Sequence, residues 1–386
     1  MKNNIRKLLF ITGTRADFGK LKPLMLSVEK SNNFICNIFT TGMHMLKCYG
    51  ETHDEIRKCG FKNNYLFINQ MGISGSDNMD IILSKTVDGL GHYIREFKTD
   101  LIVVHGDRVE ALAGAIVGAL NNILVCHIEG GELSGTVDEL IRHSITKLSH
   151  IHFVANDNSK KRLIQMGESE NSIFKIGSPE VDIMLSNTLP NIHEVKKRYN
   201  IPFDKYNIFI YHPVTTDLDN LQSNIKASIN ALVRSEKKFI VIYPNNDTGS
   251  KIIIDEYNKI RGNKNFRVFE SLRFEYYITL MKNTDSVIGN SSTGVREASV
   301  FGVPSINIGT RQNNRSNHSA IINVQDNEND ILKAINSEPK RFTPSLAFGT
   351  GNSAELFIKT ISKRSFWDTP NQKQFQDILL KGDSNK

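Results

Sequence analysis

Cysteine is scarce in this chain: there are four in 386 residues, and no two of them form a C-x-x-C pair. Neither a zinc ribbon nor a disulfide framework is therefore predicted. Unpaired cysteines in a chain of this length are typical of a reduced, cytoplasmic protein, which is the location that we expect. The four are Cys36, Cys48, Cys59 and Cys126.

The chain also lacks a long apolar run and a concentrated patch of charge. Its most apolar stretch, Ala111 to Ile128, is interrupted by two asparagines, so it predicts a helix, a turn and a strand rather than a membrane span. The apolar run behind the basic N-terminus, Leu8 to Ile11, is too short for a signal peptide. Lysine and arginine outnumber aspartate and glutamate by 48 to 41, but these charges are scattered and there is one Trp. Neither a membrane nor a nucleic acid is therefore a predicted partner.

Short runs of β-forming residues alternate with amphipathic stretches along the chain, and the pattern restarts after a polar segment over 186–205. Continuous apolar strands separated by helices predict parallel sheets covered on both faces, an α/β fold. We predict two Rossmann-like doubly wound domains, 1–185 and 186–365, with a C-terminal helix over 366–386 that rejoins the first. The first set of expected strands is 8–12, 35–40, 101–105, 123–128, 153–155 and 174–176, and the second is 207–211, 239–243, 266–269, 286–289 and 305–308.

The first strand opens into a glycine-rich turn, Gly13-Thr14-Arg15-Ala16-Asp17-Phe18-Gly19-Lys20. This differs from a P-loop because five residues instead of four separate its glycines, and Leu21 stands where Ser or Thr would bind magnesium. The remaining features are a turn, an arginine and a helix N-terminus, which together can hold an anion. Arg15 is therefore a candidate phosphate ligand, and the alternative is a surface arginine beside an ordinary turn.

Acidic residues follow the third and fourth of these strands. Asp107 comes just after the strand at 101–105, and Glu129 just after the strand at 123–128. If these strands are neighbours, both carboxylates face one crevice, where a buried charge needs a reason to be present. Asp138 is expected at the positive end of a helix, either as a third cleft acid or as an ordinary N-terminal acid. Together with Glu132 these acids could instead hold magnesium, although no spacing is diagnostic of a metal.

The second domain carries polar residues of a different kind. The run Tyr211-His212-Pro213 places a histidine at the end of a strand, and Asn245 lies in a polar loop after the next strand. Ser291 and Ser292 precede an expected helix, whose amides and hydroxyls can cradle a phosphate. The alternative for these serines is a simple N-cap. Glu297 is placed to accept hydrogen bonds from both hydroxyls of a ribose.

These motifs together resemble those of the hydrolysing UDP-N-acetylglucosamine 2-epimerases, which begin sialic acid synthesis in capsule-forming bacteria. Non-hydrolysing relatives usually carry Gln-His after the second strand, and this chain has Met43-His44 there, which favours the hydrolysing branch. The resemblance covers about residues 8–367. It rests on Gly13-Thr14-Arg15, His105-Gly106-Asp107-Arg108, His127-Ile128-Glu129-Gly130-Gly131-Glu132, His212-Pro213-Val214-Thr215-Thr216 and Gly289-Asn290-Ser291-Ser292.

The resemblance implies a glycosyltransferase-B-like pair of domains with an interdomain cleft, a UDP-sugar substrate, no metal or other cofactor, and a homodimer or homotetramer. It implies that UDP-N-acetylglucosamine and water give N-acetylmannosamine and UDP by elimination followed by water addition. Position by position, it makes Asp107, Glu129, Asp138 and His212 catalytic, and it makes Arg15, Arg108, Asn245, Ser291, Ser292 and Glu297 ligands of the substrate and its UDP group.

Three alternative functions remain open at this point. The first is the same chemistry on UDP-2,4-diacetamido-2,4,6-trideoxy-glucose, for legionaminic acid. The second is a retaining glycosyltransferase, which would share the fold and the nucleotide site but need an acceptor groove. The third is a non-catalytic sensor of nucleotide sugars, for which three acids in the cleft have no use.

Overall fold

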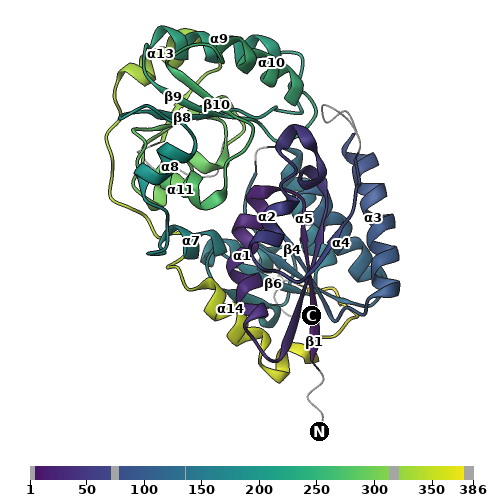
Figure 1. Ribbon diagram of the computed structural model, residues 1–386. Coiled ribbons are helices and arrows are strands. Elements are labelled where there is room, and N and C mark those ends of the chain that lie inside the picture. Colours follow the sequence, from purple (N-terminus) through teal and green to yellow (C-terminus); the bar gives the residue numbers. More distant parts are fainter. Residues whose placement is uncertain (1–4, 71–77, 135, 313–320, 378–386) are drawn as a thin grey trace, which may run out of the picture.

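The computed structural model describes residues 5–70, 78–134, 136–312 and 321–377, and within these ranges it contains two parallel sheets with helices on both faces (Figure 1). The first sheet has seven strands in the order β3-β2-β1-β4-β5-β6-β7, and the second has six in the order β10-β9-β8-β11-β12-β13. All neighbouring strands run parallel. The predicted fold of two Rossmann-like doubly wound α/β domains is confirmed.

The first domain contains the strands β1 (Arg6–Thr12), β2 (Phe34–Thr40), β3 (Asn63–Leu66), β4 (Leu101–His105), β5 (Leu124–Ile128), β6 (Ile151–Val154) and β7 (Ile173–Lys175). Its helices are α1 (Arg15–Glu29), α2 (His53–Lys58), α3 (Met79–Glu96), α4 (Val109–Leu120), α5 (Val137–Leu148), α6 (Asp157–Gln165) and α7 (Pro179–Met184). Short 3-10 helices are η1 (Gly42–Met45), η2 (Lys47–Tyr49) and η3 (Glu170–Ser172).

The second domain contains the strands β8 (Asn207–Ile210), β9 (Phe239–Ile242), β10 (Phe266–Phe269), β11 (Val287–Gly289), β12 (Ser305–Ile308) and β13 (Ile321–Val324). Its helices are α8 (Ile192–Arg198), α9 (Leu221–Arg234), α10 (Ser250–Ile260), α11 (Phe274–Lys282), α12 (Glu297–Val300) and α13 (Glu328–Asn336), with the 3-10 helix η4 (Ser292–Gly294). The chain ends on the first domain with α14 (Ser353–Ile361) and the 3-10 helix η5 (Arg364–Asp368).

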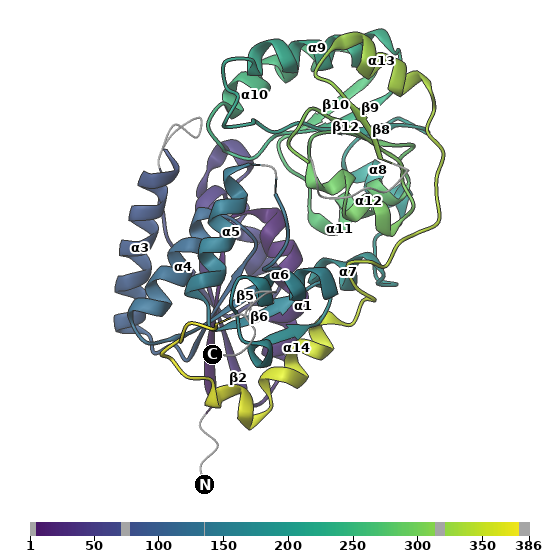
Figure 2. The same cartoon turned by 180° about the vertical axis from the view of Figure 1, so that it is seen from behind.

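Strands of the first sheet are apolar on both faces because helices cover both faces. In β4, Leu101 and Val103 belong to the core under α1 and α14, whereas Ile102 and Val104 belong to the core under α3, α4 and α5 (Figure 2). Each such buried aliphatic side chain contributes roughly 1.5–3 kcal/mol to folding. Two separate cores fix the sheet from both sides, so the loops at the carboxyl ends of its strands start from a rigid base.

The strand order reverses at one point in each sheet, between β1 and β4 in the first and between β8 and β11 in the second. Connections that leave neighbouring strands toward opposite faces open a crevice at their carboxyl ends, and this is where doubly wound sheets bind ligands. The segments that follow these four strands begin at Gly13, Gly106, Tyr211 and Asn290. They contain most of the site residues that the sequence predicts.

A glycine is required where β11 meets β8. Gly289 has a φ of +126°, and a Cβ atom there would lie 1.9 Å from the carbonyl oxygen of Ile210. Any side chain would therefore push the two strands apart at the switch point of the second sheet. The close approach of backbone to backbone fixes where Asn290 and the two serines after it emerge.

The chain returns to the first domain earlier than the sequence predicts. Phe357 and Ile361 of α14 are fully buried in the core under α1, and Phe366 of η5 follows them. Of the helix expected over 366–386, only the end of the 3-10 helix η5, up to Asp368, is present as far as residue 377, and Pro370 disfavours helical backbone at the residue just after η5. Residues 378–386 lie outside the described part, and the domain edges stay a prediction. Among the helices described, none has the length and hydropathy of a membrane span.

Candidate active site

Two adjoining cavities lie between the domains at their switch points. The first, here called the acid-lined cavity, is lined by Asp17, His105, Asp107, Glu129 and Asp138, with arginines beside them. The second, here called the adjoining cavity, is lined by Arg15, Tyr243, Phe274, Ser291 and Glu297 among others. Six residues line both: Thr14, Ala16, Lys20, His212, Asn245 and Ser292. Because both domains contribute to each wall, neither cavity exists without the contact between the domains.

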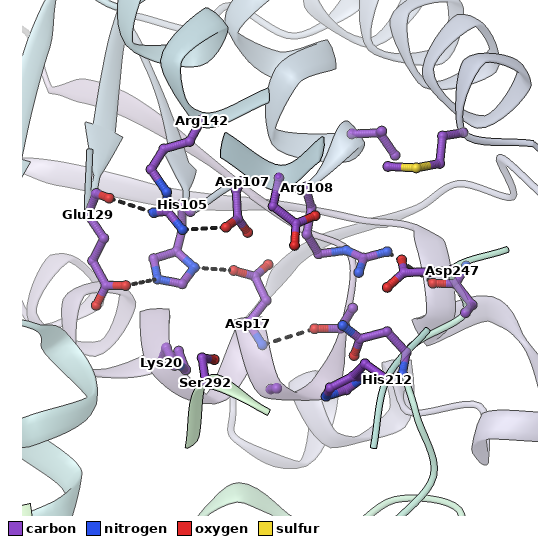
Figure 3. A pocket seen from close by; sticks show the side chains of 18 of the residues that line it. Asp17, Lys20, His105, Asp107, Arg108, Glu129, Arg142, His212, Asp247 and Ser292 are labelled. Atoms are coloured by element: carbon purple, nitrogen blue, oxygen red, sulfur yellow. Dashed lines mark hydrogen bonds and ion pairs between the residues drawn. The ribbon is translucent and has the colours of Figure 1, made fainter. Parts of the chain in front are cut away.

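His105 lies between two carboxylates in the acid-lined cavity (Figure 3). Its Nδ1 is 2.7 Å from Asp17 Oδ1, and its Nε2 is 3.2 Å from Glu129 Oε2. Burial by itself would lower the pKa of His105, but the charges of Glu129 and Asp17 outweigh it and raise this pKa to about 9. The imidazole is therefore a buried cation at neutral pH that holds the two acids in place.

Asp107 and Asp138 face the same cavity, each beside an arginine. Asp107 accepts hydrogen bonds from the guanidinium of Arg142 and from the hydroxyl of Ser134, the latter at 3.3 Å. Asp138 in the first turn of α5 lies 3.2 Å from the Nη2 of Arg311, which comes from the second domain. Burial and the nearby charge of Asp107 raise the pKa of Asp138. Asp138 is thus the cleft acid that holds a proton more readily.

Glu129 has several ion-pair and hydrogen-bond partners. Its backbone has a left-handed φ of +63°, which costs of order 1–3 kcal/mol in a residue other than glycine. Its carboxylate lies 2.7 Å from Arg296 Nη2 and also binds His105 and the hydroxyl of Ser178, while its carbonyl oxygen accepts a 2.7 Å bond from Arg142 Nη1. These cations hold the pKa of Glu129 well below its usual range in spite of burial. The carboxylate is therefore held as an anion.

Arg296 joins the second domain to three glutamates of the first. Besides Glu129, its guanidinium contacts the carboxylates of Glu132 and of Glu180, the latter at 3.2 Å. It stacks over the ring of Phe348 at 5.0 Å and is 6% exposed. Arginine suits this position because its planar fork serves several carboxylates at once. The residue is therefore the centre of an ion-pair cluster between the domains.

His212 has one fixed tautomer. The backbone N–H of Asn245 donates to its Nδ1 at 3.1 Å, so the ring proton lies on Nε2. Its own backbone N–H and carbonyl bind the side-chain amide of Asn290 at 2.6 and 2.9 Å. Burial, together with the charges of Arg311 and Arg108, keeps the pKa of His212 well below its usual range. It can therefore donate a hydrogen bond between the two cavities as a neutral imidazole.

The two predicted arginines line different cavities. Arg15 opens α1 and lines the adjoining cavity, where its Nη1 donates to Ser271 Oγ of the second domain at 2.6 Å. Arg108 lines the acid-lined cavity and donates to Asn246 Oδ1 at 3.0 Å, again across the domains. Neither is an isolated surface residue, and each is a cation at the boundary between the domains.

The segment after β11 corrects one expectation. Ser291 caps a 3-10 helix of three residues, η4, and the α-helix behind it, α12, has only four. A sizeable helix dipole is therefore missing, and the polar groups aimed at the cavities are those of a tight turn. The turn forms here because the run Ser292-Thr293-Gly294 favours a turn over a helix. Ser292 lines both cavities, and Ser291 lines the adjoining cavity.

Sequence reasoning missed Lys20, Arg296 and Glu180. Lys20 lines both cavities, and its Nζ contacts the carboxylates of Glu180 and, at 3.1 Å, Glu297. The one usable signal for Lys20 was its place in the first turns of the helix that follows the first strand, since this end of the helix lies at the predicted crevice. Nothing in the sequence pairs Arg296 with glutamates more than 100 residues away. In the described ranges, no group of three or more acidic, histidine or cysteine side chains is spaced to hold a metal ion.

A family model described as UDP-N-acetylglucosamine 2-epimerase matches residues 26–362 of the chain. A UDP-N-acetylglucosamine 2-epimerase of Neisseria meningitidis serogroup B is 45% identical over 97% of this chain and 100% of its own length. A UDP-N,N'-diacetylbacillosamine 2-epimerase (hydrolyzing) of Legionella pneumophila is 34% identical over 94% of this chain and 97% of its own length.

Similarity extends to a solved structure. The UDP-GlcNAc 2-epimerase of Methanocaldococcus jannaschii, in complex with UDP-GlcNAc and UDP, superposes with a TM-score of 0.77 at 25% identity. The superposition covers 92% of this chain and 99% of that one. Both domains and their connection are therefore shared.

The raised pKa of His105 predicts a pH-dependent stability. Its charge stabilises the fold fully below its ordinary pKa of 6.5, and this contribution is lost as the pH rises through about 9. Between pH 6.5 and 8.5 the free energy of unfolding should fall by about 2 kcal/mol more in the wild type than in His105→Gln. Urea unfolding at both pH values measures this difference. Equal pH dependence in the two proteins would show that His105 is not a buried cation.

Proposed function

Since the chain belongs to the UDP-N-acetylglucosamine 2-epimerase family, we propose that it converts UDP-N-acetylglucosamine and water to N-acetylmannosamine and UDP, as the first step of sialic acid synthesis. One observation carries this proposal: two carboxylates, Asp107 and Asp138, line the acid-lined cavity, and the neutral His212 lines both this cavity and the adjoining one. A sensor or a simple nucleotide-binding module has no need of that arrangement.

The adjoining cavity suits the UDP group. Glu297 Oε2 is buried there without a hydrogen-bond partner, which leaves an acceptor for a ribose hydroxyl. Ser291 and Ser292 supply hydroxyl donors, and Arg15 and Lys20 supply positive charge for the phosphates. With its phosphates between these groups, the nucleotide would direct its sugar past His212 toward the acids.

The first chemical step requires a base against a carbon acid. The hydrogen on C2 of the sugar is not acidic, so a carboxylate must be held against it in a site that excludes water. Removal of that proton forms a C1–C2 double bond, and the electron pair of the C1–O bond leaves with UDP. The Nε2 hydrogen of His212 and the charge of Lys20 are placed to stabilise the departing diphosphate.

The second step adds water across the double bond. A proton is returned to C2 from the opposite face, which gives the manno configuration, and hydroxide from water attaches to C1. Asp138 is suited to supply a proton because its pKa is raised, and Asp107 is then suited to act as the base. Glu129, which is held as an anion by two cations, is better suited to position His105 and Arg296 than to exchange protons.

A second candidate substrate is UDP-2,4-diacetamido-2,4,6-trideoxy-glucose. It is supported by the Legionella relative, whose name gives it as an epimerase of UDP-N,N'-diacetylbacillosamine at 34% identity. The chemistry at C1 and C2 would be the same, so the sugar is decided by contacts to C4 and C6. The 45% identity to the Neisseria enzyme over its full length favours N-acetylglucosamine.

Incubation with UDP-N-acetylglucosamine alone should release UDP and N-acetylmannosamine, and turnover in heavy water should place deuterium at C2. The deuterium follows because the proton lost in elimination exchanges with solvent before water addition. Mass spectrometry and NMR of the product measure both results, with the diacetamido substrate run in parallel. Protium retained at C2 would contradict the elimination mechanism, and no turnover without an acceptor would favour a glycosyltransferase.

Asp107→Asn and Glu297→Gln should fail in different kinetic parameters. Loss of a proton-transferring carboxylate typically costs on the order of 10²–10⁴ in rate, so Asp107→Asn should lose kcat and keep its affinity for UDP. Glu297→Gln weakens ribose binding in the ground and transition states alike, so KM should rise more than kcat falls. Calorimetry with UDP and steady-state kinetics separate the two. If Asp107→Asn loses UDP affinity and keeps kcat, the proton transfers must be reassigned around Asp138 and Glu129.

A further inference from the structure

Glu180 is a buried acid that lines neither cavity. It lies in the first turn of α7, directly behind Lys20, and it is 1% exposed. Lys20, by contrast, lines both cavities and points its ammonium group between Glu180 and Glu297. Glu180 therefore cannot touch a bound nucleotide sugar, but it can act on one through Lys20.

The cluster around Glu180 has more acids than permanent cations. Among the described residues, four glutamates contact Arg296 or Lys20, and two further cations lie close by, each of them shared with an aspartate: His105 with Asp17 and Arg142 with Asp107. With these two aspartates the cluster holds six carboxylates against four cations. The four glutamates are Glu129, Glu132, Glu180 and Glu297. A buried surplus of negative charge is costly, and it is relieved most easily if one carboxylate binds a proton.

A bound diphosphate changes what Lys20 contacts. This step rests on the proposed function, in which Lys20 turns toward the phosphates between the two cavities. Glu297 then loses the ammonium group but gains ribose hydroxyls as donors, because it lines the adjoining cavity. Glu180 does not line that cavity and, among the cations in the described part of the chain, keeps Arg296 at 3.2 Å, whose guanidinium also contacts Glu129 and Glu132.

We propose that Glu180 binds a proton when a nucleoside diphosphate draws Lys20 away, and that it thereby acts as a positioning residue that lets Lys20 move without leaving an unpaired buried charge. The carboxylate would return the proton when the nucleotide leaves and Lys20 swings back. Nucleotide binding and the charge of the interdomain cluster are in this way coupled through one lysine.

The groups that face Glu180 favour this assignment. Burial and the charge of Glu297 raise the pKa of Glu180 to about 7, and the charges of Lys20 and Arg296 limit the rise. Glu129 adds a further carboxylate on one side, and the phenol of Tyr277 on α11 is a neutral neighbour on the other. Movement of the Lys20 ammonium group away from Glu180 and the arrival of a negatively charged diphosphate both raise the pKa of Glu180. Uptake should therefore be small well below pH 7 and approach one proton at pH 8.

Titration calorimetry with UDP, in two buffers that differ in ionisation enthalpy, measures the protons taken up on binding. At pH 8 the terminal phosphate of UDP, with a pKa of about 6, is already ionised and contributes little. The wild type should take up close to one proton at pH 8, and its UDP affinity should fall by up to tenfold per pH unit above pH 7.5. Glu180→Gln should show neither effect. Glu132→Gln, which removes a carboxylate from Arg296 but not from Lys20, should keep both.

The outcomes separate this inference from the proposed function. Failure of the wild type to bind UDP would contradict the proposed function itself. Tight UDP binding with no proton uptake at pH 8, or with the same uptake in Glu180→Gln as in the wild type, would overturn the role of Glu180 alone. If Glu180→Gln does not fold, the wild type still decides the question, because the absence of proton uptake at pH 8, where UDP is fully ionised, contradicts the proposal.

Discussion

One buried guanidinium, that of Arg296, fixes how the two domains meet. It comes from the second domain and is bound by Glu129, Glu132 and Glu180 of the first. Removing one partner from a buried ion pair typically costs roughly 3–5 kcal/mol, because the remaining charge is left without compensation. The cluster therefore favours the one arrangement in which all of its members are paired. In that arrangement the switch points of the two sheets face each other and both cavities are complete.

The same cluster explains why the acids of the site have different roles, some in proton transfer and others in positioning. The carboxylate of Glu129 forms ion pairs with Arg296 and His105, and its backbone adopts a left-handed conformation. In our proposal the proton transfers are then left to Asp107 and Asp138, which line the acid-lined cavity and each contact an arginine. Charged residues that take no part in the proton transfers thus position those that do. Lys20 links this cluster to the adjoining cavity through its contacts with Glu180 and Glu297.

Much of the fold could be predicted from the sequence, because the inner strands are continuous apolar runs between helices. The edge strands β3 and β13 were missed because asparagines interrupt their short runs, Asn63 and Asn64 in β3 and Asn323 in β13. The sequence also indicated the family, which the comparisons confirm, and the loops whose residues line the two cavities. It could not reveal the ion pairs of Arg296 or Lys20, since these join residues that only the tertiary fold brings together.

The central claim is that the buried Arg296 cluster holds the domains in the arrangement that forms the site. Small-angle X-ray scattering of Arg296→Met without ligand tests it most directly, with Lys22→Met as the matched control. The control breaks a partly exposed interdomain pair, Lys22 with Glu275 at 2.5 Å, which should contribute little. We predict a larger radius of gyration for Arg296→Met than for the wild type and an unchanged one for Lys22→Met. Scattering by Arg296→Met identical to that of the wild type would contradict the account.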